Sequence, residues 1–202
     1  MKDRQRLFQD KIENIIDKRL LGSRAELQFS EMAITVDFLA DPALDSTSIV
    51  GGATLAAPGV PARSIEINSR GAGLIDSLVN GLRSTCGVMY PSLDNITLSN
   101  YQATGFHDTR FGSGRSYVMD LVIFGSTGNR LYFSGTSNSL IKASIMAVKE
   151  TFQFLIDCER TVATLRECIK DADARHRADV RTELVSELTE VVLVTNFNRK
   201  DG

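Results

Sequence analysis

Residues 64–78 read SIEINSRGAGLIDSL, and this stretch decides the fold. Ser64–Asn68 alternates between polar and apolar side chains, which is typical of a half-buried strand. The glycine-rich turn at 69–73 follows directly and leads into a helix. Four apolar residues share one face of that helix, namely Leu74, Leu78, Leu82 and Cys86. The sequence therefore predicts a strand that passes through a tight turn into an amphipathic helix.

The same arrangement recurs later in the chain. Arg130–Ser134 is expected to be a strand, Gly135–Ser139 a turn with several candidate N-caps, and a long helix then runs to about Ile169. The apolar face of this helix carries Leu140, Ile141, Ile145, Val148, Phe152, Leu155 and Ile156. Strand, turn and helix thus occur twice in the same order.

Further strands are expected before each of these units. Met32–Leu39 alternates well enough for a strand, and Asp41–Pro61 reads as a loop that contains a short strand near Ala53–Ala57. In the second half, Ile96–Thr104 and Tyr117–Phe124 read as strands joined by an extended hairpin tip. The fold class is therefore α+β, with two βββα units that form an internal pseudo-repeat of structure.

One extra helix is expected at each end of the chain. Residues 3–20 and 172–193 both carry apolar side chains at three- and four-residue steps. The expected organisation is an N-terminal helix (1–22), a duplicated βββα domain (23–170) and a C-terminal helical extension (171–202).

Composition narrows the class of protein. A net charge of −2 argues against a nucleic-acid binder, which needs a basic excess. The charged start lacks the apolar core of a secretory signal, and no later segment is long and apolar enough to span a bilayer. Three cysteines without CxxC spacing predict reduced thiols rather than a zinc site. We expect a cytoplasmic protein without nucleic acid, membrane or metal as partner.

Residues suited to catalysis are scarce. The two histidines are His107, on the expected hairpin tip beside Asp108, and His176, on the final helix. An enzyme that uses His107 and Asp108 is the least favoured hypothesis, because a solvated loop is the commoner explanation for such a pair. The stretch 112–116 contains two glycines but precedes a strand, so no helix N-terminus would meet a phosphate there. The chain is expected to need no cofactor and to catalyse no reaction.

The two strand-to-helix turns are the strongest candidates for ligand binding. Backbone N–H groups in the first turn of a helix lack intrahelical partners and carry partial positive charge. They can hold a carboxylate, and glycine allows a ligand to approach closely. Ordinary turn chemistry with capping is the alternative for each turn.

Three segments resemble the C-terminal allosteric domain of 2-isopropylmalate synthases. The stretch 69–78 resembles the family's G-x-G-P-V-D-A turn and helix. The stretch 96–101 resembles its L-x-D-Y strand, and 135–147 its G-x-S-T-D-I-I-x-A-S-x-x-A helix start. Order and spacing agree across residues 32–157. The sequence departs from these motifs at Leu74, Asn100 and Ser139, which replace Pro, Asp and Asp.

The resemblance implies a homodimer that binds an end-product amino acid between its subunits. In that family leucine is the effector of isopropylmalate synthase and isoleucine that of citramalate synthase. Carried over by motif, the effector-binding residues are Gly71, Gly73, Asp76, Tyr101, Ser137, Asn138 and Ser139. The replacement of an acidic residue by Ser139 leaves the identity of the amino-acid-like effector open.

The catalytic barrel of those synthases has no counterpart in the sequence. Such a barrel takes about 250 residues, whereas about 30 precede the first expected strand. The two amphipathic terminal helices, which lie outside the repeated core, favour a freestanding regulatory domain in amino-acid biosynthesis over an excised one. The alternative is a structural subunit that docks a catalytic or other partner through its terminal helices.

Overall fold

The computed structural model describes residues 2–37, 46–107, 115–124 and 128–195. The first unit contains β1 (Glu26–Asp37), β2 (Ser46–Ala57), β3 (Val60–Gly71) and helix α2 (Leu74–Cys86). A short 3₁₀ helix, η2 (Pro91–Asn95), leads to the second unit. That unit contains β4 (Thr97–His107), β5 (Arg115–Phe124), β6 (Arg130–Ser137) and helix α3 (Leu140–Ala174). Helices α1 (Lys2–Leu20) and α4 (Ala178–Val192) flank the two units, so the expected α+β fold of two βββα units is confirmed.

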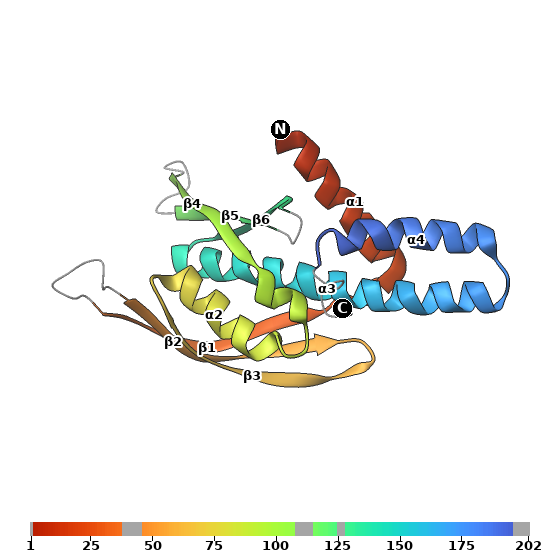
Figure 1. Ribbon diagram of the computed structural model, residues 1–202. Coiled ribbons are helices and arrows are strands. Elements are labelled where there is room, and N and C mark those ends of the chain that lie inside the picture. The colour runs from red at the N-terminus through yellow and green to blue at the C-terminus, as the bar shows by residue number, and fades with distance from the viewer. Residues whose placement is uncertain (1, 38–45, 108–114, 125–127, 196–202) are drawn as a thin grey trace.

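The two sheets lie on opposite sides of a helical layer (Figure 1). Each sheet is antiparallel, with strand order β1-β2-β3 in the first and β4-β5-β6 in the second. Helix α2 packs against β3 and β2, while α3 packs against β6 and β5. We call the face of each sheet that is turned toward the helices its inner face.

The core fills the space between these layers. Inward alternation buries Ile49, Leu55 and Ile67 in the first sheet and Leu121 and Ile123 in the second. The largest fully buried side chains include those of Phe152, Leu78 and Leu82 on the two helices. Burial of these apolar stripes is the main favourable contribution to folding.

The terminal helices belong to the same core. Helix α1 buries Ile12, Ile15, Ile16 and Leu20 and ends where Leu21 and Gly22 adopt positive φ angles of 50° and 75°. Helix α3 continues through residue 170, where the sequence placed the end of the duplicated domain, and α4 folds back beside it (Figure 1). At a rise of about 1.5 Å per residue, α3 extends well beyond the sheets.

The prediction of a loop over Asp41–Pro61 is wrong for its described part, because β2 is a strand of 12 residues. Gly51 and Gly52 suggested a loop, but they lie opposite a bulge in β1 between Phe29 and Met32. A Cβ atom on Gly51 would stand 2.7 Å from both the Glu31 carbonyl oxygen and Met32 Cγ. These glycines therefore permit strand pairing at the bulge rather than ending the strand.

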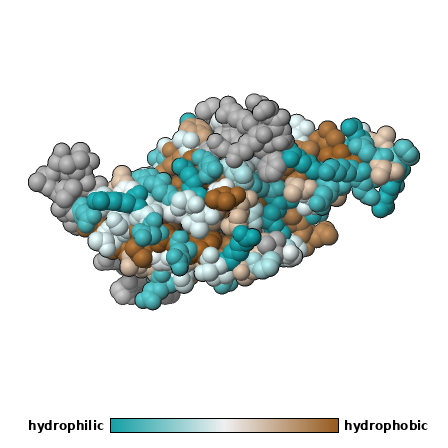
Figure 2. Space-filling view, turned by 60° about the horizontal axis from the view of Figure 1, so that its bottom comes forward, coloured by the Kyte–Doolittle hydropathy of each residue, from teal (hydrophilic) through white to brown (hydrophobic). Residues whose placement is uncertain are grey.

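The outer face of the first sheet is solvent-exposed and mixed in character. Figure 2 turns this side of the molecule forward and shows hydrophilic, neutral and hydrophobic residues interspersed. Val50 is exposed there beside small polar residues such as Ser48 and Thr54. Among the described helices, none is both long enough and apolar enough to cross a membrane.

Candidate functional site

The first strand-to-helix turn is tightly packed against its own strand. A Cβ atom on Gly71 would stand 2.7 Å from the Ser77 backbone nitrogen and 2.9 Å from Asp76 Cβ. The buried Ser77 hydroxyl lies 2.6 Å from the Thr47 carbonyl oxygen and 2.8 Å from that of Gly73. Only glycine at position 71 allows the end of β3 to lie this close to the helix.

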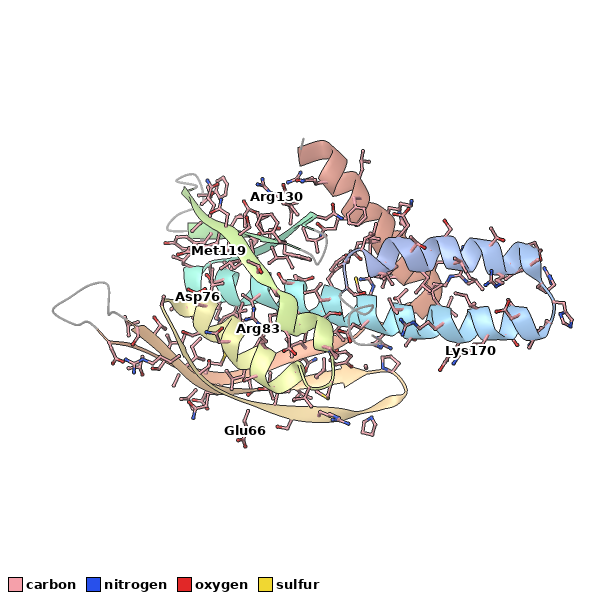
Figure 3. The ribbon with its side chains drawn as sticks, viewed as in Figure 1. Glu66, Asp76, Arg83, Met119, Arg130 and Lys170 are labelled. Carbon is pink, nitrogen blue, oxygen red and sulfur yellow. The ribbon has the colours of Figure 1, made fainter. Side chains whose placement is uncertain are left out.

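The N-terminus of α2 is left open by its cap residue. Gly73 is the N-cap, its backbone is extended, and no side chain caps the helix. The first N–H groups of a helix have no intrahelical partner, so they are available to a negatively charged ligand. Asp76 lies half-buried in the first turn, as Figure 3 shows.

The second turn satisfies its N–H groups with its own hydroxyl groups. Ser139 is the N-cap of α3, and its hydroxyl accepts a hydrogen bond from the Lys142 nitrogen at 3.4 Å. Ser137 accepts from the Ser139 nitrogen at 3.4 Å and donates to the Asn138 side-chain oxygen at 3.3 Å. The two turns thus have the same position in the fold but different capping.

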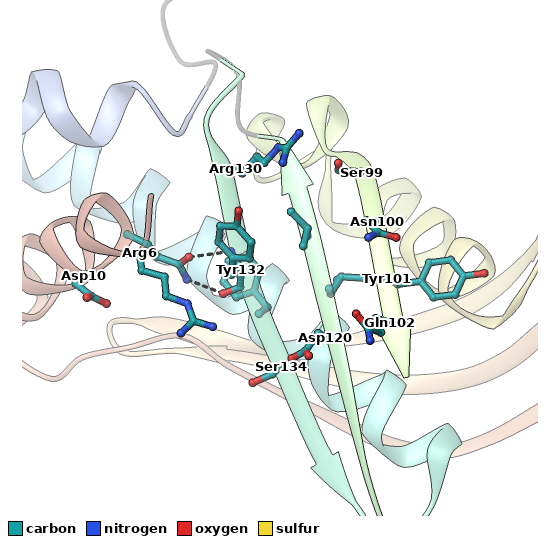
Figure 4. A pocket seen from close by; sticks show the side chains of 14 residues that line it. Arg6, Asp10, Ser99, Asn100, Tyr101, Gln102, Asp120, Arg130, Tyr132 and Ser134 are labelled. Atoms are coloured by element: carbon teal, nitrogen blue, oxygen red, sulfur yellow. Dashed lines mark hydrogen bonds between the residues drawn. The ribbon is translucent and has the colours of Figure 1, made fainter. Parts of the chain in front are cut away.

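Both helices begin at the same end of the molecule (Figure 1), and α2 and α3 pack against each other. The two predicted turns therefore lie at one end of the helical layer. Tyr101 lies instead on β4, the edge strand of the second sheet, where it pairs with Leu121 and is 57% exposed. Its ring extends away from β5 (Figure 4). The arrangement in one chain gathers the two turns but leaves Tyr101 on an open sheet edge.

A polar cleft that the sequence did not predict lies between α1 and the outer face of the second sheet (Figure 4). It has a volume of about 560 Å³. Its polar lining comes from α1 and all three strands and includes Arg6, Asp10, Asn100, Gln102, Asp120, Arg130 and Ser134. The alternation of β4–β6 could have indicated the floor of this cleft, but its wall depends on where α1 docks.

Helix α1 is fixed at this cleft by one side-chain amide. Gln9 donates from Nε2 to the Tyr132 carbonyl oxygen at 3.0 Å and accepts from the Tyr132 nitrogen at 2.8 Å. The Tyr132 hydroxyl donates to the Gln5 side-chain oxygen at 2.7 Å. Gln9 therefore makes the two hydrogen bonds that a further strand would make with the edge of β6.

Buried ionisable groups serve the structure of α3. Asp157 accepts from the Ala25 nitrogen at 2.8 Å and from Arg160 at 3.0 Å, which ties the start of β1 to the helix. Burial raises the pKa of the Asp157 carboxyl, and these donors counteract part of the rise. The buried Glu159 accepts from the Ser92 nitrogen and holds η2 against α3.

The described residues offer few groups suited to covalent or metal chemistry. Burial raises the pKa of the Cys86 thiol to about 11 and that of Cys158 also, so both stay protonated and weakly nucleophilic. His176 lies exposed in the turn between α3 and α4 rather than on α4, and Asp108 falls outside the described residues. Within the described part of the chain, no three His, Cys, Asp or Glu residues are grouped as a metal site would require.

No family model matches the chain, and no curated protein matches it either.

Proposed function

We propose that the chain is a non-catalytic regulatory domain that binds an amino-acid-like effector and acts as a homodimer, as its resemblance to the allosteric domain of 2-isopropylmalate synthases implies. The observation that carries the proposal is the pair of strand-to-helix turns at one end of the duplicated fold. Their helices are adjacent, and the N-terminus of α2 has no side-chain cap.

The chemistry of this end suits a zwitterion. The uncapped N–H groups after Gly73 would receive the carboxylate, since partial positive charge gathers at a helix N-terminus. Asp76 would hold the ammonium group from the same first turn. Ser137, Asn138 and Ser139 would add hydroxyl and amide groups from the second turn, and Tyr101 would come from an adjacent copy. A cytoplasmic location fits the three free thiols of the chain.

Calorimetric titration with leucine, isoleucine, valine and their 2-oxo acids tests this proposal. Asp76→Asn should weaken the binding of amino acids at least 10-fold and spare the 2-oxo acids, which have no ammonium group. Asp171→Asn is the matched control, because Asp171 is exposed on α3 and pairs with Arg175. The absence of heat and of thermal stabilisation with all six compounds would contradict effector binding.

The second candidate function is an interaction subunit for a separate catalytic protein. It is favoured by the α3–α4 hairpin, which extends beyond both sheets (Figure 1). The apolar side of α1 packs into the core of the chain, so removing residues 1–21 would delete the buried Ile12 and Ile16 and expose the core surface that they cover. Charge reversal at exposed hairpin positions, such as Lys170→Glu, is the better test. Loss of a partner in co-purification, with unchanged dimer mass, would support this candidate.

A further inference from the structure

Three of the four sheet edges carry features that block the addition of another strand. The edge of β6 is bonded by Gln9 of α1. Strand β1 carries Glu26, Glu31 and Asp37 and contains a bulge, and β3 carries Arg63, Glu66 and Arg70. Charged side chains and bulges are common means by which proteins protect exposed edges.

The fourth edge, β4, carries none of these charges. Its residues 97–106 read TLSNYQATGF, without a single Lys, Arg, Asp or Glu. A register shift lies between Leu98 and Asn100, but pairing with β5 is regular from Asn100 to His107. A long uncharged edge of this kind exposes a row of backbone N–H and C=O groups suited to a further strand.

The inner face of β4 is also uncovered. Tyr101 and Ala103 pair with Leu121 and Met119 of β5, which are only 1% and 4% exposed. Residues opposite each other in an antiparallel pair share a face, so Tyr101 and Ala103 occupy core-like positions. Both nevertheless stay exposed, because α3 packs against β6 and β5. Tyr101 is 57% exposed, and Phe106 on the outer face is 55% exposed.

We propose that β4 is the dimer interface, where the β4 strands of two copies pair antiparallel and join the two second sheets into one sheet of six strands. A two-fold axis pairs the strand with its own copy, so a charged residue close to the axis would lie beside the same charge of the other copy. The uncharged sequence of β4 fits this self-pairing, and the charged edges of β1 and β3 do not. The inference rests on the proposed homodimer and adds where the two copies meet.

Pairing at β4 gives the uncovered positions a partner. Tyr101 and Ala103 of one copy come to lie beside inner-face residues of the other, which removes aromatic and methyl surface from water.

Ala103→Lys tests the interface, because it places two like charges across the axis. The matched control is Ser64→Lys, which introduces the same charge at an exposed position of β3, an edge strand of the first sheet. Light scattering after size exclusion should give twice the chain mass for the wild type and for Ser64→Lys. Ala103→Lys should give 22.2 kDa, with an unchanged circular dichroism spectrum. A wild-type monomer at 100 μM, or a dimer of Ala103→Lys, would overturn the proposal.

Single cysteines provide a second measurement that does not depend on disrupting the dimer. In a Cys168→Ser background, we expect oxidation to cross-link two copies through Tyr101→Cys, Gln102→Cys or Ala103→Cys. Glu66→Cys, on the outer face of the first sheet, should stay uncross-linked. Cross-linking at position 66 alone would show that the two copies meet at a surface other than β4. A protein that remains monomeric and instead binds an extended peptide at β4 would show that the edge serves a different partner.

The outcomes separate the interface from the proposed effector function. If Ala103→Lys converts a dimeric wild type to a monomer, and no amino acid or 2-oxo acid gives heat, the proposed interface stands and the proposed effector binding fails. If an effector binds equally well to a dimeric wild type and to a dimeric Ala103→Lys variant, the proposed function stands and the proposed interface fails.

Discussion

The two βββα units both press a strand glycine against their helix, Gly71 in the first and Gly135 in the second, but the first unit also has a glycine within the helix. The contacts of that helix glycine and of Gly135 differ in kind. In the first unit the glycine is in the helix: a Cβ atom on Gly81 would meet Ile67 Cγ2 at 2.7 Å and Ser69 Oγ at 2.8 Å. In the second unit the glycine is in the strand: a Cβ atom on Gly135 would collide with the Ala143 carbonyl oxygen and stand 2.5 Å from the Ala147 nitrogen. The obstacle is a pair of side chains in one unit and the helix backbone in the other.

The two units therefore share a topology, but these two helix–sheet contacts differ in how well they tolerate an added methyl group. Side chains can rotate away from a new methyl group, whereas hydrogen-bonded helix backbone cannot move without displacing the whole helix. Position 135 is therefore less tolerant of a larger side chain than position 81. The second unit is also the one whose helix carries the buried carboxylates Asp157 and Glu159.

The largest expected effect comes from adding one methyl group to each contact. Gly135→Ala should lower the free energy of unfolding by about 3 kcal/mol, because overpacking against fixed backbone lies at the upper end of such costs. Gly81→Ala should lower it by about 1 kcal/mol or less, since alanine regains up to about 1 kcal/mol of helix propensity. Urea denaturation of both variants measures the difference. Equal losses of stability would show that both contacts accommodate the added methyl group to the same extent.

The sheet edges offer the next test, because only the second sheet depends on a terminal helix to satisfy an edge. Gln9→Leu keeps a side chain of similar size at the position but leaves the N–H and C=O of Tyr132 without their partner. Each buried unsatisfied group costs about 1–3 kcal/mol, and partial exposure of this site reduces the sum to about 2 kcal/mol. Gln28→Leu on the exposed edge of the first sheet is the control and should change stability little. If Gln9→Leu leaves the free energy of unfolding unchanged, water replaces the amide at this edge.

The sequence predicts the repeated order of strands and helices because alternation and helical periodicity are local properties. The same local signals place the helix starts at Leu74 and Leu140, but residues 69–71 and 135–137, which were predicted as turn, belong to β3 and β6. Gly51 and Gly52 were misread because their role depends on the β1 bulge opposite them, which only the paired strands reveal.

The cleft and the pairing of Gln9 with the edge of β6 could not be predicted, since both depend on docking between distant segments. Gln9 resembles any polar residue on a surface helix until α1 lies beside Tyr132, 123 residues later in the chain. Tyr101 was selected by resemblance to a motif. Its exposure, and that of the whole β4 edge, follows from how far α3 reaches across the second sheet.

The pH dependence of stability should distinguish the terminal helices from the first unit, because ion pairs join α1 to α4. Glu187 of α4 lies 2.5 Å from Arg19 and 2.7 Å from Lys18 of α1. Burial opposes its ionisation, but these hydrogen bonds outweigh burial and hold the pKa of the Glu187 carboxyl below its ordinary value of 4.5. A lowered pKa contributes stability that is present above the unfolded-state value and is lost as pH falls through the folded-state value.

Glu187→Gln should therefore be less stable than the wild type at pH 7, by less than the effect of Gln9→Leu. The two proteins should converge as the pH falls below about 4.5 toward 3. Thermal melts at several pH values measure this convergence, and Glu66→Gln on the first sheet is the control. A constant difference from pH 7 to pH 3 would mean that Glu187 contributes through packing rather than charge.

The smallest expected effect concerns the caps that distinguish the two helices. Ser139→Ala removes the cap of α3 and should lower the free energy of unfolding by about 0.5–1 kcal/mol. Gly73→Ser adds a capping hydroxyl to α2 and should raise stability by a few tenths of a kcal/mol, because a Cβ atom on Gly73 meets no atom within 4 Å.

The same Gly73→Ser substitution links the caps to the proposed function. If the open N–H groups of α2 hold the effector carboxylate, the new hydroxyl competes for them, so the effector should bind more weakly while the protein becomes more stable. Ser139→Ala should change effector affinity less, since hydroxyl groups of this turn already accept from the N–H groups of Ser139 and Lys142. Calorimetry beside urea denaturation separates the two effects. If Gly73→Ser is stabilised and still binds the effector as tightly as the wild type, the effector carboxylate does not bind at the N-terminus of α2.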